Sequence, residues 1–217
     1  MATTVLLADD HKIVRDGLRA LLEQEDDMDV VGEAENGRDA VRLARDLKPN
    51  VIVMDISMPD LNGMEATRQV CRRCPQTRVM ALSVHADRRF VTEMLKAGAA
   101  GYLLKDCAFE ELVRGIRTVV DGNTYLSPRV ADAVVEGHIR APASDAEPTG
   151  SVLTAREREV LQLLTEGHGT KQIARRLHVS TKTIDTHRQH IMDKLDIHNV
   201  AELTKYAVRE GLTTLEQ

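Results

Sequence analysis

Short apolar runs without polar alternation recur along the first half of the chain, and a stretch with helical spacing follows each one. Runs of this kind are typical of strands buried in a parallel sheet, and they lie at residues 4–8, 29–34, 51–55, 78–83 and 100–104. The stretches that follow them predict helices at 11–24, 37–47, 62–74, 87–97 and 108–121. Five strand–helix repeats in series predict an α/β fold, a doubly wound five-stranded parallel sheet with helices on both faces.

The rest of the chain carries helical patterns only. One more short helix is predicted at 128–140, where Pro128 suits a first helical turn. Residues 141–151 hold two Pro, one Gly and no bulky apolar residue, which is typical of a linker. Residues 152–211 predict four helices, and the two joined by Leu177-His178-Val179-Ser180 form a helix-turn-helix candidate. We therefore expect one domain at 1–122, a helix and linker at 123–151, and a small all-α domain at 152–217.

Three aspartates close two of the predicted strands. Asp9 and Asp10 follow the first run, and Asp55 ends the third. Ligands bind at the carboxyl ends of the strands in an open α/β sheet, so three carboxylates meet at one edge if these strands are neighbours. That much negative charge is unfavourable without a cation, and oxygen-only ligands suit Mg²⁺. A carboxylate beside Mg²⁺ can accept a phosphoryl group.

Two further polar side chains fall at the same predicted edge. Ser83 ends the fourth strand, and Lys105 follows the fifth. A phosphoryl group on Asp55 needs a cation on one side, an ammonium on another and a hydroxyl as a hydrogen-bond donor. The acidic pair, Lys105 and Ser83 supply these three parts.

Residues 1–122 resemble the receiver domain of bacterial two-component response regulators, whose sheet is flavodoxin-like. The resemblance rests on the acidic pair, the run Met-Asp-Ile-Ser-Met-Pro at 54–59, Ser83, and the run Gly-Tyr-Leu-Leu-Lys at 101–105. It implies that Asp55 is the phosphoacceptor and that a sensor histidine kinase is the phosphodonor.

The same resemblance implies a role for each neighbour of Asp55. Asp9, Asp10 and Asp55 hold Mg²⁺ together with the backbone carbonyl of Ser57. Ser83 is then the switch hydroxyl, Tyr102 the switch aromatic residue and Lys105 the phosphate-binding lysine.

Charge is divided unevenly between the two parts of the chain. The net charge over 217 residues is −5. Residues 1–151 hold 19 Lys and Arg against 25 Asp and Glu, whereas residues 152–217 hold 10 against 9 and five of the eight His. The C-terminal part is therefore the better candidate for binding a polyanion.

Composition also excludes several classes of protein. No apolar stretch approaches the ~20 residues that cross a bilayer, and the N-terminus has no basic signal-peptide region. Three Cys argue against a disulfide framework. We therefore expect a cytoplasmic protein with no membrane association.

Residues 180–195 predict a helix with one apolar and one polar face. Ile184, Ile191 and Leu195 share the apolar face with His187, and an α-helix of this kind fits the major groove of DNA. Thr186 and Gln189 can hydrogen-bond base edges, and Asp185 can accept from cytosine N4. The candidates for phosphate contact are Lys171, Thr181, Lys182, Thr183, Arg188 and Lys194.

Residues 152–211 resemble the LuxR-type helix-turn-helix. The resemblance rests on Leu153-Thr154-x-Arg156-Glu157-x-Glu159-Val160-Leu161, Lys171-x-Ile173-Ala174, Ser180-x-x-Thr183-Ile184-x-x-His187 and Lys194-Leu195. With the receiver it places the chain among the NarL/FixJ-type response regulators, and it implies double-stranded DNA as a partner and a homodimer when phosphorylated or DNA-bound. Val200 departs from the family, which commonly has Arg after the Asn at this point.

Two other functions remain open at this stage. Haloacid-dehalogenase-type phosphatases also use a strand-end Asp with Mg²⁺, but they need a second Asp two residues later, where this chain has Ser57. The helical domain could also bind a protein instead of DNA, because its charge is nearly neutral and Val200 removes a possible phosphate contact. We expect a transcription regulator that is not an enzyme and is controlled by phosphorylation of Asp55.

Overall fold

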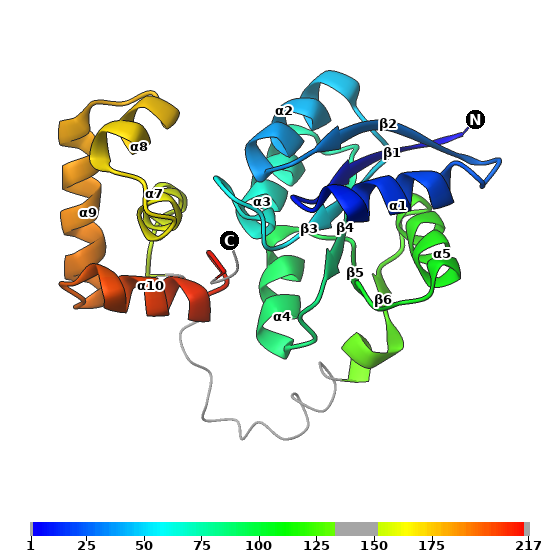
Figure 1. Ribbon diagram of the computed structural model, residues 1–217. Helices are drawn as coiled ribbons and strands as arrows, with labels where there is room; N and C mark the ends of the chain where they lie inside the picture. Colours follow the sequence, from blue (N-terminus) through cyan, green and yellow to red (C-terminus); the bar gives the residue numbers. More distant parts are fainter. Residues whose placement is uncertain (1, 133–151, 215–217) are drawn as a thin grey trace. The chain divides into compact units, whose positions relative to one another are not determined.

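The computed structural model describes residues 2–132 and 152–214, which form an α/β unit and a helical unit (Figure 1). The strands of the α/β unit are β1 (Thr3–Ala8), β2 (Met28–Ala34), β3 (Val51–Asp55), β4 (Arg78–Ser83), β5 (Gly101–Leu104) and β6 (Tyr125–Leu126). Its helices are α1 (Lys12–Leu22), α2 (Gly37–Leu47), α3 (Gly63–Arg73), α4 (Arg88–Ala97) and α5 (Phe109–Val120). The helical unit contains α7 (Ala155–Thr165), α8 (Thr170–Arg176), α9 (Thr181–Leu195) and α10 (Val200–Arg209).

The sheet is parallel, with the strand order β2-β1-β3-β4-β5-β6. The prediction of five strands was wrong by one, because β6 adds a short sixth strand beside β5. Tyr125 N donates to Ala100 O (3.1 Å), and Ser127 N donates to Tyr102 O (3.1 Å). Two residues are too few to show the apolar periodicity that marks the other strands.

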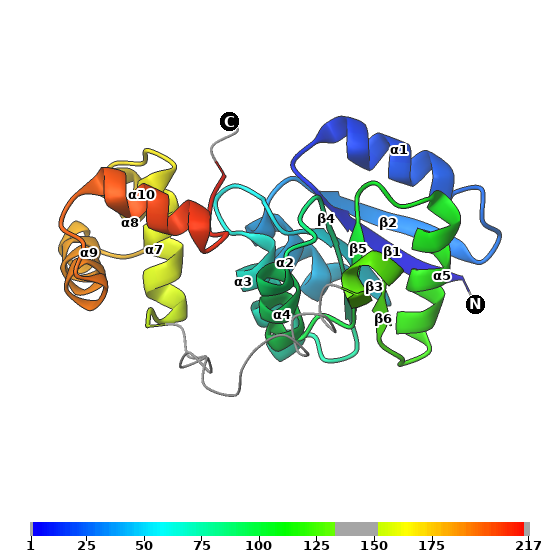
Figure 2. The same ribbon diagram turned by 90° about the horizontal axis from the view of Figure 1, so that it is seen from below.

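Helices cover both faces of the sheet, as predicted (Figure 2). On one face α1 and α5 pack over a core that includes Leu7, Val53 and Ile116. On the other face, where α2, α3 and α4 lie, Ile56, Met94 and Tyr102 belong to a second core. The strands β1 and β3 lie between these layers and bury apolar side chains on both sides, which explains why their sequences do not alternate.

The strand register brings the predicted site residues to one edge. Strand β1 pairs with β3 so that Ala8 lies opposite Met54, and each next residue is an aspartate, Asp9 and Asp55. Across β3 and β4, Asp55 lies opposite Leu82, and across β4 and β5, Ser83 lies opposite Leu104. The carboxyl ends of four neighbouring strands therefore present Asp9, Asp55, Ser83 and Lys105 together.

Side-chain caps begin two helices of the helical unit. Thr154 and Glu157 form the capping box of α7, and Ser180 Oγ accepts from Thr183 N at the start of α9. The four helices enclose their own apolar core, which includes Val160, Ile184 and Ile191. This core positions α9 with one face outward.

Parts of two sequence predictions fall outside the described residues. The predicted helix at 128–140 is helical over 128–132, and its remainder and the linker at 141–151 lie beyond the residues that the structure describes. Among residues 2–132 and 152–214, no helix combines the length and apolarity that a membrane span requires.

Candidate functional site

Asp9, Asp55 and Lys105 form an ion-paired group at the carboxyl edge of the sheet. Lys105 Nζ lies 2.7 Å from Asp9 Oδ2 and 3.2 Å from Asp55 Oδ2. Asp9 and Asp55 are 3% and 4% exposed. One ammonium thus lies between two buried carboxylates, at the edge where the sequence predicted these residues to meet.

The electrostatics of Asp55 show that the negative charge is only partly compensated. The net pKa of Asp55 is raised to about 6. Burial is the largest cause; Lys105 acts to lower the pKa, and the charges of Asp9 and Asp10 act to raise it. Burial lowers the pKa of Lys105, but Asp55 and Asp9 outweigh this effect and the net direction is upward. The site therefore favours additional positive charge.

The donor atoms fit a hard divalent cation. One ligand atom from each of Asp9, Asp10, His11 and Asp55 lies within 4.8 Å of the others. Three of these four groups are carboxylates, the ligand type that Mg²⁺ prefers. Ser57, the fourth predicted ligand, follows β3 by two residues and is half-buried.

His11 was not predicted to belong to this cluster. Its Nδ1 lies 3.1 Å from Asp9 Oδ1 and 3.0 Å from Asp10 Oδ1, and its backbone N–H donates to Asp9 Oδ1 (2.9 Å). The available signal was its position directly after the acidic pair. The imidazole therefore restrains the orientation of both carboxylates.

The backbone around Asp55 is packed closely enough to require glycine. Ile56 N donates to Asp55 Oδ1 (2.8 Å), and Gly63 N donates to Ile56 O (2.8 Å). A Cβ on Gly63 would lie 1.9 Å from the Asp55 carbonyl oxygen. Helix α3 can begin directly against the end of β3 only because this position has no side chain.

Ser83 and Tyr102 are both connected to the loop that follows β4. Ser83 is 1% exposed, and its Oγ accepts from His85 N (3.1 Å). Tyr102 is fully buried, and its hydroxyl donates to His85 O (2.6 Å). The net pKa of Tyr102 is raised to about 12, chiefly by burial, although a hydrogen bond with Ser83 acts in the opposite direction.

His85 therefore links the two predicted switch residues through its backbone. Its ring stacks on Phe90 at the start of α4, with 4.5 Å between ring centroids. The sequence alone assigns no role to His85, because a backbone contact leaves no mark on the residue type. The Ser83–His85–Tyr102 contacts connect the acidic edge of the sheet to α4.

The predicted DNA-reading residues lie on the outer face of α9. Lys182, Asp185, Thr186 and Gln189 are exposed, whereas Ile184 and Ile191 are fully buried. His187 and Leu195 are half-buried. The helical pattern thus predicted the two faces of this helix.

A shallow hollow of about 530 Å³ lies beside the start of α9. Lys171 and Thr181, two predicted phosphate contacts, line it together with Arg175 and His178. Arg175 and His178 were not predicted, although Arg175 lies one helical turn after Lys171. Basic side chains from α8 and from the turn before α9 therefore meet here.

The remaining predicted DNA contacts have partners within the helical unit. Arg188 Nη1 donates to Thr170 Oγ1 (3.4 Å), and the Thr183 and Ser180 hydroxyls are 2.8 Å apart. Gln189 Nε2 donates to Asp193 Oδ1 (2.7 Å). Lys194 Nζ lies 2.7 Å from Glu157 Oε2, so that its charge is engaged by α7. Binding of DNA by Gln189 or Lys194 would have to exchange these contacts.

Comparison with protein families gives two matches that together cover most of the chain. Residues 5–117 match the response regulator receiver domain. Residues 151–207 match the bacterial regulatory proteins of the luxR family.

Relatives of similar length align with nearly the whole chain. The oxygen regulatory protein NreC of Staphylococcus carnosus is 36% identical over 212 residues, which cover 96% of this chain and 98% of NreC. The response regulator UvrY of Escherichia coli K12 is 38% identical over 212 residues, covering 98% and 96%. A solved structure of two RcsB dimers bound to two parallel DNAs has a TM-score of 0.59 at 26% identity and covers 97% of this chain and 99% of that one. The chain therefore belongs to the NarL/FixJ-type response regulators of two-component systems, transcription regulators that join a receiver domain to a LuxR-type DNA-binding domain.

Proposed function

We propose that Asp55 accepts a phosphoryl group from the phosphohistidine of a sensor kinase and that this modification controls DNA binding. The observation that carries the proposal is the pair of contacts from Lys105 Nζ to Asp9 and Asp55, because it places an ammonium beside the candidate nucleophile. In the transfer, a carboxylate oxygen of Asp55 bonds to phosphorus as the P–N bond breaks, and the electron pair of that bond returns to the imidazole. Lys105 is then placed to hold a phosphoryl oxygen.

The surrounding residues have distinct parts in this reaction. Asp9, Asp10 and Asp55, with the carbonyl of Ser57, would hold Mg²⁺, which when bound neutralises phosphoryl oxygens. Ser83 can donate its hydroxyl to another phosphoryl oxygen if this bond replaces its present hydrogen bond with Tyr102, while its Oγ accepts from His85 N. Movement of Ser83 toward a phosphoryl oxygen would pull on the backbone of His85, whose carbonyl accepts a hydrogen bond from Tyr102.

Labelling from a small phosphodonor tests the phosphoacceptor. With acetyl phosphate and Mg²⁺, wild-type protein should gain one phosphoryl group by intact mass spectrometry, and Asp55→Asn should gain none. Asp106→Asn is the matched control, because Asp106 lies next to Lys105 in sequence but pairs with Arg129. Undiminished labelling of Asp55→Asn would refute the assignment.

For the second domain, we propose that α9 enters the major groove of double-stranded DNA, with the receiver at 1–122 and the DNA-binding domain at 152–217. Thr186, Gln189 and Asp185 are exposed on the outer face of α9 and carry groups that match base edges. The proposed phosphate contacts are Lys171, Thr181, Lys182, Thr183, Arg188 and Lys194. Dimers on paired half-sites are proposed from the RcsB dimers seen on DNA, with the protein acting in the cytoplasm.

Two substitutions separate reading of bases from contact with phosphates. Gln189→Ala should relax base preference at one position by about 1–3 kcal/mol. Lys182→Ala should weaken binding to all DNA sequences alike and reduce the slope of log K against log salt by about 1. Lys182 suits this test better than Lys194, because Lys194 also pairs with Glu157. Binding to a selected and a scrambled duplex measures both; equal loss on both duplexes in both variants would contradict the recognition-helix assignment.

A further inference from the structure

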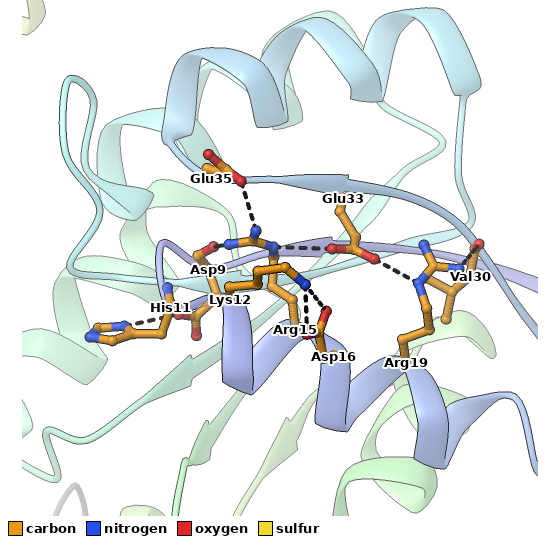
Figure 3. Close-up of polar contacts among 9 residues, drawn as sticks. All are labelled: Asp9, His11, Lys12, Arg15, Asp16, Arg19, Val30, Glu33 and Glu35. Atoms are coloured by element: carbon orange, nitrogen blue, oxygen red, sulfur yellow. Dashed lines mark hydrogen bonds and ion pairs between the residues drawn. The ribbon is translucent and has the colours of Figure 1, made fainter.

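Arg15 of α1 is a buried arginine directly behind the acidic edge. Its side chain is 3% exposed, and arginine is almost never so buried unless it is paired. Nη1 donates to Asp9 O (2.6 Å), Nε to Glu33 Oε2 (3.1 Å) and Nη2 to Glu35 Oε1 (2.8 Å) (Figure 3). All three nitrogens of the guanidinium thus donate hydrogen bonds, one to the backbone carbonyl of Asp9 and two to carboxylates at the end of β2.

The contact with Asp9 is made to its carbonyl group and not to its carboxylate. That carbonyl belongs to the peptide unit between Asp9 and Asp10, and peptide units are planar. On the preceding side, Asp9 N donates to Ala34 O (3.1 Å). The Asp9 backbone is therefore held by β2 through its N–H and by Arg15 through its C=O, which fixes the directions in which both carboxylates leave the chain.

The two glutamates hold the guanidinium in place and balance its charge. Glu33 also accepts from Arg19 Nε (2.6 Å). Hydrogen bonds from Arg19 and Arg15 keep the pKa of Glu33 below its usual range although burial acts in the opposite direction. Arg15 can therefore bind the Asp9 carbonyl while Glu33 and Glu35 offset its positive charge.

We propose that Arg15 is a positioning residue for the divalent-cation site: it holds the peptide plane between Asp9 and Asp10 so that their carboxylates meet the cation together with Asp55. The inference rests on the proposed function, since it assumes that the acidic edge binds Mg²⁺. Groups that orient metal ligands without touching the metal typically contribute 10–100-fold to metal affinity.

Arg19 provides a matched control within the same network. It lies one turn further along α1, shares Glu33 with Arg15, and otherwise contacts Glu23 and Val30 O. None of these atoms belongs to the acidic edge. Arg15→Gln and Arg19→Gln thus remove the same charge from the same helix, and only the first releases the Asp9 carbonyl.

Mg²⁺ titration calorimetry on the full chain tests the proposal, with urea unfolding as a parallel measure of stability. Arg15→Gln should raise the Kd for Mg²⁺ about tenfold or more, and Arg19→Gln should leave it within about twofold. Loss of a nearby positive charge would by itself tighten Mg²⁺ binding, so weaker binding cannot come from the charge change.

Stability and Mg²⁺ affinity together distinguish a structural role of Arg15 from a positioning role. If both variants lose stability while Mg²⁺ affinity stays unchanged or rises, Arg15 is only structural and the proposal is overturned. If Arg15→Gln does not fold, Arg15→Lys replaces it, because an ammonium cannot reproduce the planar three-way contact. That variant should bind Mg²⁺ at least about threefold more weakly, and wild-type affinity in it overturns the proposal. If the wild type itself binds no Mg²⁺, the cation site fails and this inference fails with it.

Discussion

Replacing Asp55 with Asn should stabilise the receiver domain whenever no divalent cation is bound. The pKa of Asp55 is raised from 3.8 to about 6, chiefly by burial, so the folded protein holds this proton more tightly than the unfolded chain does. Stability is consequently lost as pH rises from about 4 to 6. The shift of about 2 pKa units corresponds to a loss of about 3 kcal/mol of stability in the wild type above pH 6. An Asn of the same shape is uncharged and does not have this loss.

Hydrogen exchange at the buried amides of β3 measures this difference in the full chain, because these amides report opening of the receiver core. In EDTA at pH 7.5, Asp55→Asn should slow exchange about 100-fold after correction for intrinsic rates. At pH 5 the gain should fall to about half in free energy. Saturating Mg²⁺ should reduce the difference in exchange rate between Asp55→Asn and the wild type. Only the wild type keeps the full set of carboxylates, so Mg²⁺ binding should stabilise it more than the variant. A gain of equal size at pH 5 and pH 7.5, or no gain at either, would refute the argument from burial.

Three further predictions concern packing, an ion pair and the switch loop. Gly63→Ala should lower the free energy of unfolding by about 1–3 kcal/mol in urea, because its Cβ would meet the Asp55 carbonyl, whereas exposed Gly17→Ala in α1 should raise it by about 0.5–1 kcal/mol. Burial raises the pKa of Glu157, but Lys194 and Thr154 outweigh burial, so the net pKa lies below the ordinary 4.5. The ionised Glu157 therefore stabilises the fold above pH 4.5, and this stability is lost as pH falls further. In acid unfolding followed by circular dichroism, Lys194→Met should lose less stability between neutral and acid pH than the wild type. Tyr102→Phe removes the hydrogen bond to His85 O and should speed amide exchange at the start of α4 without changing acetyl phosphate labelling, and unchanged exchange there would contradict the proposed connection.

The apolar patterns predicted most of the fold because the physics behind them is local. Strands β1 and β3 are buried on both faces, and strands in this position require apolar side chains at successive residues. The two-residue β6 lies below the length at which a pattern exists, so only its pairing with β5 reveals it.

The candidate site could be predicted as far as its residues end strands, because parallel strands bring their carboxyl ends together. The roles of Arg15 and Lys194 could not be predicted in this way. A basic residue on an amphipathic helix is ordinarily solvated. The acidic partners of Arg15 are Glu33 in β2 and Glu35 just after it, 18 and 20 positions later in the chain. Likewise, Lys194 meets Glu157 of α7 at a separation of 37 residues.

The raised pKa of Asp55 and the position of Arg15 are connected by the rigidity of the backbone. Asp9 and Asp55 repel one another, and Lys105, which lies between them, offsets only part of this repulsion. Here Arg15 fixes the peptide after Asp9, and Gly63 packs against the carbonyl of Asp55. The repulsion therefore persists in the folded protein, where it raises the pKa of Asp55 and favours a divalent cation.

A double-mutant cycle tests this connection. If Arg15→Gln lets Asp9 move away from Asp55, the stabilisation produced by Asp55→Asn should be smaller in that background by at least about 0.5 kcal/mol. The same exchange measurement at pH 7.5 in EDTA gives all four corners of the cycle, and Arg19→Gln supplies a background in which the gain should be unchanged. Strict additivity with Arg15→Gln would mean that the carboxylates keep their separation without Arg15, because the strands, Gly63 and Lys105 are enough to hold this edge.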